Sequence, residues 1–384
     1  MFKNLTIYRI GAGWTPELTA MEEALDAAKF VPCSPSQDKS VGWVPPRGEE
    51  HGALVESVAG QLILKLMIET KSVPSASVKA KAQEAADHIE ATTGRKPGKK
   101  ETKELREDAL AALLPQAFPR QAAVLVWIDR TAGLLMTDAS SQGKNDEVIT
   151  ALVRAFDGLS LTLLQTARTP QGAMAAWLAS TEPETDWPEG FNVERACELR
   201  SADEEKSVVK FNRHHLLTDE VRKHIAEGKL PLWAAMSWEG RIGFVLTESM
   251  QLKKLAFLEG VFNDRPSDEE SGFDTDVVLA TGELSKLIPA LVSALGGEIQ
   301  PGATLPPAEA SGVTTYTDGQ PDPLLEQARS IVVAEGRASI SYLQRKLQIG
   351  YNRAARLLED LEALGVVSHM TAAGLRDVLV KGGA

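Results

Sequence analysis

The spacing of apolar residues along the chain predicts both helices and paired strands. Helical periodicity extends over residues 76–112, with a break at 94–98, and returns over residues 144–156. Short apolar runs bounded by turn residues predict strands at 61–68, 124–129, 133–138, 232–238 and 241–247. The last two strands are expected to form a hairpin about Glu239-Gly240. We therefore predict an α+β fold.

Two segments near the N-terminus are read from their turn and cap residues. Thr15-Pro16 is a good helix start, because Thr caps the first turn and Pro is tolerated within it. The apolar positions of that helix are Leu18, Met21, Leu25 and Ala28. The stretch CSPSQDKSVGWVPPRG, at residues 33–48, is rich in Pro, Ser and Gly and is expected to be loop.

The C-terminal region has a separate pattern. An aperiodic stretch rich in Pro, Gly, Ser and Thr predicts a flexible linker at 304–319, which separates residues 1–303 from residues 320–384. Three helical periods and two short strand-like runs, VVSHM and RDVLV, follow the linker, and Gly365 is expected to end the third helix. This order predicts a winged helix-turn-helix domain. The expected inward positions are Leu324, Ala328, Ile331, Val332, Ile340, Leu343, Leu347, Ala355, Leu358, Leu361 and Leu364.

The net charge of −12 argues at first against a nucleic-acid partner, but the charge is segregated along the chain. Residues 71–106 carry nine basic and five acidic side chains, and this excess suits a surface that follows DNA phosphates. An ordinary solvated helical hairpin is an equally open reading. A second, weaker basic cluster consists of Lys210, Arg213, Arg222 and Lys223. The candidate DNA contacts in the two clusters are Lys79, Lys81, Lys96, Lys99, Lys100, Lys210 and Arg213.

The predicted winged helix carries a basic stretch at the start of its third helix. Every charged residue between Gly336 and Leu358 is basic. The N-terminal end of such a helix meets base edges in the major groove. The candidate DNA contacts here are Arg345, Asn352, Arg353 and Arg356. A winged helix used only for protein contacts is the alternative.

The sequence offers no catalytic or metal-binding constellation. His214 and His215 are adjacent, so on a strand they would point to opposite faces. Cys33 has no evident base partner, and the chain contains two cysteines in all, too few for a disulfide framework. The GAGW motif at 11–14 lacks the third glycine of a dinucleotide loop. We expect no catalytic residue, no metal and no cofactor.

The N-terminus lacks the pattern of a signal peptide, and apolar runs such as residues 122–128 are too short to span a bilayer. The acidic run at residues 268–276 lacks the spacing of a calcium loop and is expected to be a solvated face. We expect a cytoplasmic, nucleoid-associated protein with no membrane partner.

Several strings between residues 2 and 299 resemble the RdgC family of recombination-associated proteins: FKNLTIYRI, SQDKSVGWVPP, LLPQAFPR followed by WID, and FDTDVVLATGELSKLIPALVSALGGE. The resemblance implies a ring-shaped homodimer that encloses duplex DNA without sequence preference, limits RecA and has no catalytic activity. It places Phe118 at a dimer contact and Lys210 and Arg213 on a basic patch that faces the hole. A basic residue is common in the family where this chain has Gln116, and Arg120 is a candidate replacement.

The string ASISYLQRKLQIGYNRAARLLEDLEALGVVS resembles the γ domain of FtsK-type DNA translocases. The resemblance implies a domain that reads short G-rich polar sequences and contacts the XerD recombinase, and it makes Asn352, Arg353 and Arg356 the reading residues. The wing, HMTAAGLRDVLV, departs from the polar tip common in that family, and no P-loop motif occurs in the chain.

Together these observations predict a non-catalytic protein that combines a DNA-encircling, RdgC-like ring with a tethered winged helix. The ring would bind duplex DNA and modulate RecA-dependent recombination and replication, and the winged helix would add sequence or recombinase recognition. The alternative is an interaction adaptor whose winged helix binds a XerD-like recombinase rather than DNA.

Overall fold

The computed structural model describes residues 2–182, 186–201, 206–258 and 269–299, and parts of the C-terminal region. Those parts are residues 324–335, 343, 347, 357–358, 360–362, 364–368 and 378–379. The chain divides into two compact units, Met1–Pro306 and Pro307–Ala384. Each unit is described below by itself.

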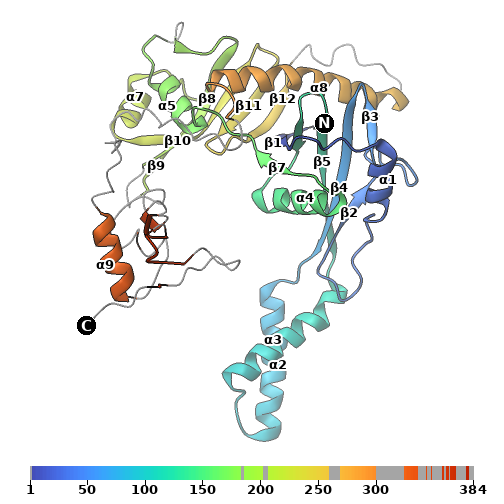
Figure 1. The fold of residues 1–384 in the computed structure, drawn as a ribbon. Coiled ribbons are helices and arrows are strands. Elements are labelled where there is room, and N and C mark those ends of the chain that lie inside the picture. The colour runs from blue at the N-terminus through green and yellow to red at the C-terminus, as the bar shows by residue number, and fades with distance from the viewer. Residues whose placement is uncertain are drawn as a thin grey trace. The chain divides into compact units, whose positions relative to one another are not determined.

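An antiparallel sheet organises the first unit (Figure 1). Its main path runs β2-β4-β5-β6-β1-β12-β11-β10-β8-β9, while β3 pairs with β4 and β7 pairs with β1. The strands are β1 (Asn4–Ile10), β2 (Lys39–Val44), β3 (Glu56–Val58), β4 (Gln61–Lys71), β5 (Pro119–Asp129), β6 (Leu134–Thr137), β7 (Leu161–Leu163), β8 (Phe191–Ser201), β9 (Val208–Asn212), β10 (Lys229–Trp238), β11 (Ile242–Thr247) and β12 (Leu252–Phe257).

Two hydrophobic cores lie on opposite faces of this sheet, because side chains alternate between the faces along each strand. On β4, Ile63 belongs to the first core, and its neighbours Leu62 and Leu64 belong to the second. The first core also contains apolar side chains of α5 (Pro170–Ala179), α7 (Asp219–Ala226) and α8 (Glu269–Ala294). The second contains those of α1 (Leu18–Asp26) and α4 (Gln142–Ala155).

Helix α8 is long and apolar enough, over Gly272–Ala294, to pass a length-and-composition test for a membrane span. Its buried apolar positions belong to the first core, and they include Val277, Leu284 and Leu291. Two ion-pair networks connect it to the rest of the unit. Arg47 contacts Asp274 at 2.6 Å, and Arg241 forms a bidentate pair with Glu283 at 2.7 and 2.8 Å. These contacts are those of a core helix.

A helical hairpin connects the end of β4 to the start of β5. It consists of α2 (Ser75–Thr93) and α3 (Lys99–Leu113), and the short 3-10 helix η1 (Leu114–Gln116) leads from it into β5. The helical hairpin lies at the far end of β4 and β5 from α8 (Figure 1). The predicted helical segment 76–112, its break at 94–98 and the β10–β11 hairpin are thereby confirmed.

The structure corrects two predictions at the N-terminal end. Residues 33–48 are not all loop, because β2 lies within them and pairs with β4. Trp43 is buried there, and Gly42 lies so close to Phe30 that an added Cβ would come within 2.4 Å of the Phe30 Cα. The first helix begins at Leu18 rather than at Thr15-Pro16, and Leu18 is exposed.

The second unit has a core of its own. Helix α9 (Leu325–Glu335) contributes Ala328 and Val332 to it. Gly365 has φ +68°, and Val366 N–H donates to Leu361 O, so the expected C′ glycine is confirmed. Leu364, expected to face inward, is 59% exposed. The other buried members of this core are Leu325, Leu343, Leu357, Leu358, Leu361, Val366 and Val367.

Candidate nucleic-acid interface

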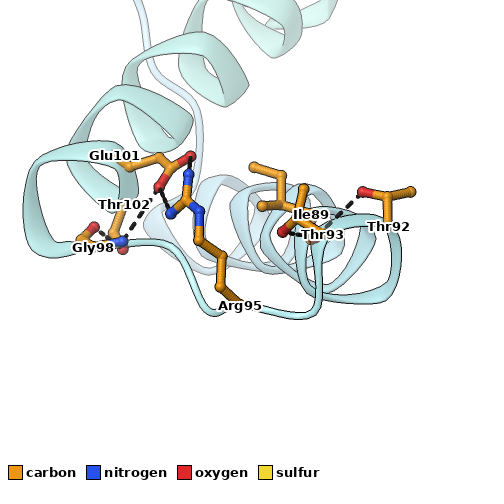
Figure 2. A network of polar contacts seen from close by, with 7 residues as sticks. All are labelled: Ile89, Thr92, Thr93, Arg95, Gly98, Glu101 and Thr102. Atoms are coloured by element: carbon orange, nitrogen blue, oxygen red, sulfur yellow. Dashed lines mark hydrogen bonds and ion pairs between the residues drawn. The ribbon is translucent and has the colours of Figure 1, made fainter.

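The turn of the helical hairpin is held by a polar network (Figure 2). Gly94 ends α2 in the left-handed region, with φ +72°. Glu101, in the first turn of α3, accepts hydrogen bonds from Arg95 Nη1 at 2.8 Å, from Arg95 Nη2 at 3.2 Å and from the Gly98 N–H at 3.3 Å. Thr102 Oγ1 donates to Gly98 O at 2.9 Å. The Arg95 guanidinium therefore supports the turn.

The electrostatic effect of this network is mutual. The Arg95 guanidinium and the Gly98 N–H hold the pKa of Glu101 below its ordinary value, with the bond to Arg95 as the main cause. The carboxylate in turn raises the pKa of Arg95. A carboxylate in the first turn also interacts favourably with the positive end of the helix dipole. Glu101 thus organises the start of α3.

The lysines around this turn are exposed, and most form loose ion pairs. Lys96 Nζ lies 3.8 Å from Glu90, and Lys100 Nζ lies 3.9 Å from Glu104. Their side chains are 81% and 93% exposed. Pairs this exposed contribute about 0–1 kcal/mol, so a phosphate can replace the carboxylate at little cost. Within the described ranges, no ion pair is formed by Lys79, Lys81 or Lys99.

The basic excess of the helical hairpin is narrower than the sequence segment indicated. Helix α3 continues beyond Arg106 and includes Glu107 and Asp108, so Ser75–Leu113 carries eight basic and seven acidic side chains. Lys103 pairs with Glu107 at 3.5 Å. The excess is concentrated at the turn, where Arg95, Lys96, Lys99 and Lys100 face one acidic neighbour in sequence, Glu101. We call these four basic residues the turn cluster.

An exposed aromatic residue lies at the root of the helical hairpin. Phe118, two residues after the end of η1, is 89% exposed, and it is followed by the exposed Pro119 and Arg120. Gln116 is exposed as well. Two further apolar side chains, Val31 and Leu110, are 68% and 43% exposed. Large apolar side chains that remain in water at one end of a fold commonly mark a protein contact.

The second basic cluster lies near the other end of the sheet. Lys210 is in β9, and Arg213 follows that strand with φ +54°. Arg222, on α7, pairs with Asp219 at 2.7 Å, and its side chain is 28% exposed, against 52% for Lys210. The structure thus keeps Lys210 and Arg213 within one short segment and ties Arg222 to its own helix.

The predicted reading residues of the winged helix, Arg345, Asn352, Arg353 and Arg356, lie outside the described residues. Several of the described residues of the second unit form its hydrophobic core. Leu343 and Leu357 are fully buried, and Val367 forms an antiparallel bridge with Val378. The second unit therefore has the buried positions that a compact helical domain needs.

Comparison with known proteins gives two separate matches. The profile of a family described as "Putative exonuclease, RdgC" matches residues 1–298. A protein of Dechloromonas aromatica (strain RCB), "Recombination-associated protein RdgC", is 42% identical over 304 residues, which is 78% of this chain and 98% of that protein. The chain belongs to the RdgC family. Proteins of the same name from Herminiimonas arsenicoxydans and Bordetella pertussis are 42% and 38% identical, over 77% of this chain and 98% of each relative.

The profile described as "Ftsk gamma domain" matches residues 319–381. The relatives from Dechloromonas and Herminiimonas are aligned over nearly their full length with about three quarters of this chain. This RdgC-family protein therefore carries an FtsK γ domain in addition to the region that it shares with them.

The family description names an exonuclease, whereas the relatives are named recombination-associated proteins. The titratable groups of this RdgC-family chain therefore matter, because a metal site or an activated nucleophile would support the first description. No group of three or more His, Cys, Asp or Glu residues suited to a metal is found among the described residues. Burial raises the pKa of the Cys197 thiol to about 12, and burial also raises that of Cys33. Neither thiol is activated as a nucleophile.

The sequence predicts the helical hairpin and makes Phe118 and Lys210 candidate site residues, but it does not reveal which side chains lie beside Lys210 and Lys103. Glu198 lies beside Lys210 on the adjacent strand β8, Trp233 lies one strand further on β10, and Glu107 pairs with Lys103. Strand register brings Trp233, Glu198 and Lys210 together across 35 positions of sequence, and no local pattern signals that. The Lys103–Glu107 pair has i,i+4 spacing, so it was accessible from the sequence.

Proposed function

We propose that this protein binds DNA without catalysing its cleavage. In this proposal two copies form a ring that encloses duplex DNA without sequence preference and modulates RecA-dependent recombination and replication. The C-terminal domain, of winged-helix type, adds recognition of a DNA sequence or of a recombinase. The observation that carries the proposal is the turn cluster, a set of exposed basic side chains on a chain of net charge −12.

Charge separation supports a DNA partner for an acidic protein. The field near a bound duplex is set by the side chains that line the contact rather than by the net charge. Lysines that exchange a loose carboxylate partner for a phosphate bind through counterion release, which is independent of sequence and sensitive to salt. Such contacts suit a protein that slides along DNA.

Phe118 supports self-association. An exposed Phe at the root of a helical hairpin gains roughly 1.5–3 kcal/mol when it is buried in a partner. In a two-fold dimer the same patch is used by both copies, so the gain is counted twice. A closed dimer would slow escape from DNA without requiring strong individual contacts.

The test is duplex-DNA binding across a salt series with the full chain, residues 1–303 and residues 320–384, each on random and on G-rich polar sequence. We expect residues 1–303 to bind both DNAs alike with a steep salt dependence, and residues 320–384 to prefer one DNA. Failure of residues 1–303 to bind at low salt would overturn the ring proposal.

Two controls separate the competing activities. Incubation of the full chain with end-labelled linear duplex and Mg²⁺ should leave the DNA intact, and progressive loss of the label would instead support the exonuclease description. Charge reversal by Arg353→Glu should weaken DNA binding by residues 320–384. Unchanged binding would count against DNA reading by the winged helix.

A further inference from the structure

The side chain of Lys210 lies across the neighbouring strands of the sheet instead of extending away from them. Strand register places Lys210 of β9 beside Glu198 of β8, and Glu198 beside Trp233 of β10. The Lys210 Nζ is 3.7 Å from Glu198 Oε2 and 5.5 Å from the centroid of the Trp233 ring. The lysine side chain therefore reaches over its neighbouring strand to the next one.

This row of three residues lies on the face of the sheet opposite the first core. The sequence neighbours Cys197, Leu199 and Phe211 belong to that core, so Glu198 and Lys210 project to the other face. The Lys210 side chain is 52% exposed, whereas that of Glu198 is 21% exposed. The ammonium thus faces solvent, with the carboxylate closer to the sheet.

The two contacts of the ammonium are both electrostatic. A carboxylate within 4 Å attracts it directly, and the face of an indole ring within about 6 Å attracts a cation through the ring quadrupole. Together they favour the folded-down conformation of a side chain that has four rotatable bonds. A phosphate that approaches this face would offer the ammonium the same kind of partner as Glu198 does.

A second basic residue, Arg200 on the adjacent strand β8, has a similar partner. Arg200 Nη2 lies 3.9 Å from Glu248 Oε1, and Glu248 Oε2 accepts a hydrogen bond from Gln171 Nε2 at 3.0 Å. Lys210 and Arg200 therefore each have a carboxylate within 4 Å.

We propose that Glu198 is a positioning residue that holds Lys210 over Trp233 when DNA is absent, and that a DNA phosphate competes with Glu198 for the ammonium. The proposal rests on the DNA-binding function proposed above. Each binding event at this site then exchanges an internal ion pair for a phosphate contact. The internal pair lowers the affinity of the contact and shortens its lifetime, which favours sliding over fixed attachment.

The test compares the affinity of the full chain for random-sequence duplex after Glu198→Gln and after Glu194→Gln. Glu194 is exposed on the same strand and, within the described part of the chain, forms no ion pair, so it matches the change of charge without touching Lys210. We expect Glu198→Gln to raise affinity about twofold to fivefold, as a partly exposed ion pair implies, and Glu194→Gln to have a smaller effect.

The coupling to Lys210 is tested in a double variant. Lys210→Met should weaken binding and reduce the slope of log K against log salt by about 0.9 for each Lys210 that contacts a phosphate, which a purely structural role of Lys210 would not do. Adding Glu198→Gln to Lys210→Met should then give no gain in affinity. A gain of the same size in both backgrounds would overturn the positioning role.

The outcomes distinguish the two proposals. Loss of affinity with Lys210→Met but no gain with Glu198→Gln would overturn the role of Glu198 and leave the DNA function intact. Unchanged affinity and salt slope with Lys210→Met would instead remove Lys210 from the DNA interface. Equal thermal unfolding midpoints among the variants would show that neither result arises from misfolding.

Discussion

Arg95 and Glu101 form a bidentate ion pair across the turn between α2 and α3, with N–O distances of 2.8 and 3.2 Å. Because the same carboxylate accepts the Gly98 N–H, one side chain joins the turn to the first turn of α3. The carboxylate of Glu101 thus orders the basic end of the helical hairpin.

The first prediction concerns pH. Arg95 holds the pKa of Glu101 below its ordinary 4.5, so the contribution of Glu101 to the turn is complete above that pH. It is lost as pH falls through the lowered pKa of the folded protein. We expect the Gly98 amide resonance to titrate below pH 4.5 and, in Arg95→Gln, at a higher pH. Identical midpoints in the two proteins would contradict this.

The second prediction concerns Phe118. Phe118→Ala should leave the thermal midpoint unchanged, because the side chain is 89% exposed, but should weaken self-association by at least tenfold. It should shorten the lifetime of the DNA complex more than it slows association. Val153→Ala, at a 49% exposed apolar position on α4 outside the exposed set Phe118, Val31 and Leu110, is the matched control. Equal losses in association rate and lifetime would argue against ring closure through Phe118.

The third prediction concerns the exposed lysines. Lys99→Gln should lower the salt slope of DNA binding by about 0.9 if Lys99 contacts one phosphate, and Lys79→Gln and Lys81→Gln should behave alike. Lys286→Gln makes the same change of charge on α8, where Lys286 is 66% exposed and pairs with Glu283. A similar reduction for Lys286→Gln would mean that the effect comes from net charge alone.

The fourth prediction concerns packing at the edge of the sheet. In Gly42→Ala the new Cβ would lie 2.4 Å from Phe30 Cα and 2.6 Å from Phe30 N, so backbone must move. We expect a loss of roughly 1–3 kcal/mol in the free energy of unfolding. Gly143→Ala, which meets nothing within 4 Å on helix α4, should be neutral or stabilising. Urea denaturation of both variants measures the difference.

The sequence predicts those elements whose signals are local. Helices α2 and α3 follow from their periodicity and from the glycines between them, and Gly365 follows from its position after an apolar helix. Strand β2 does not follow from the sequence, because Pro, Ser and Gly surround it and the pairing with β4 that makes it a strand is not local. Tertiary pairing there outweighs residue preference.

In the candidate site, too, some features follow from local sequence and others depend on tertiary pairing. The turn cluster is visible in the sequence because its members are neighbours. The Lys210–Glu198–Trp233 row depends on strand register, which the sequence does not reveal. Helical periodicity predicts that Leu364 faces inward, but Leu364 lies just before the left-handed Gly365, where the helix ends and its periodicity no longer applies.

The attachment of the helical hairpin has a mechanical consequence. Strand β6 pairs with β5 over Val126–Asp129, whereas β4 follows β5 as far as Pro119, so the outer part of β5 has β4 as its one strand partner in the described sheet. Helix α2, with 19 residues, is about 28 Å long. A bend of about 10° at its base would move its tip by about 5 Å, by the geometry of a helix of that length. The turn of the helical hairpin can therefore shift by several ångströms while both cores stay intact.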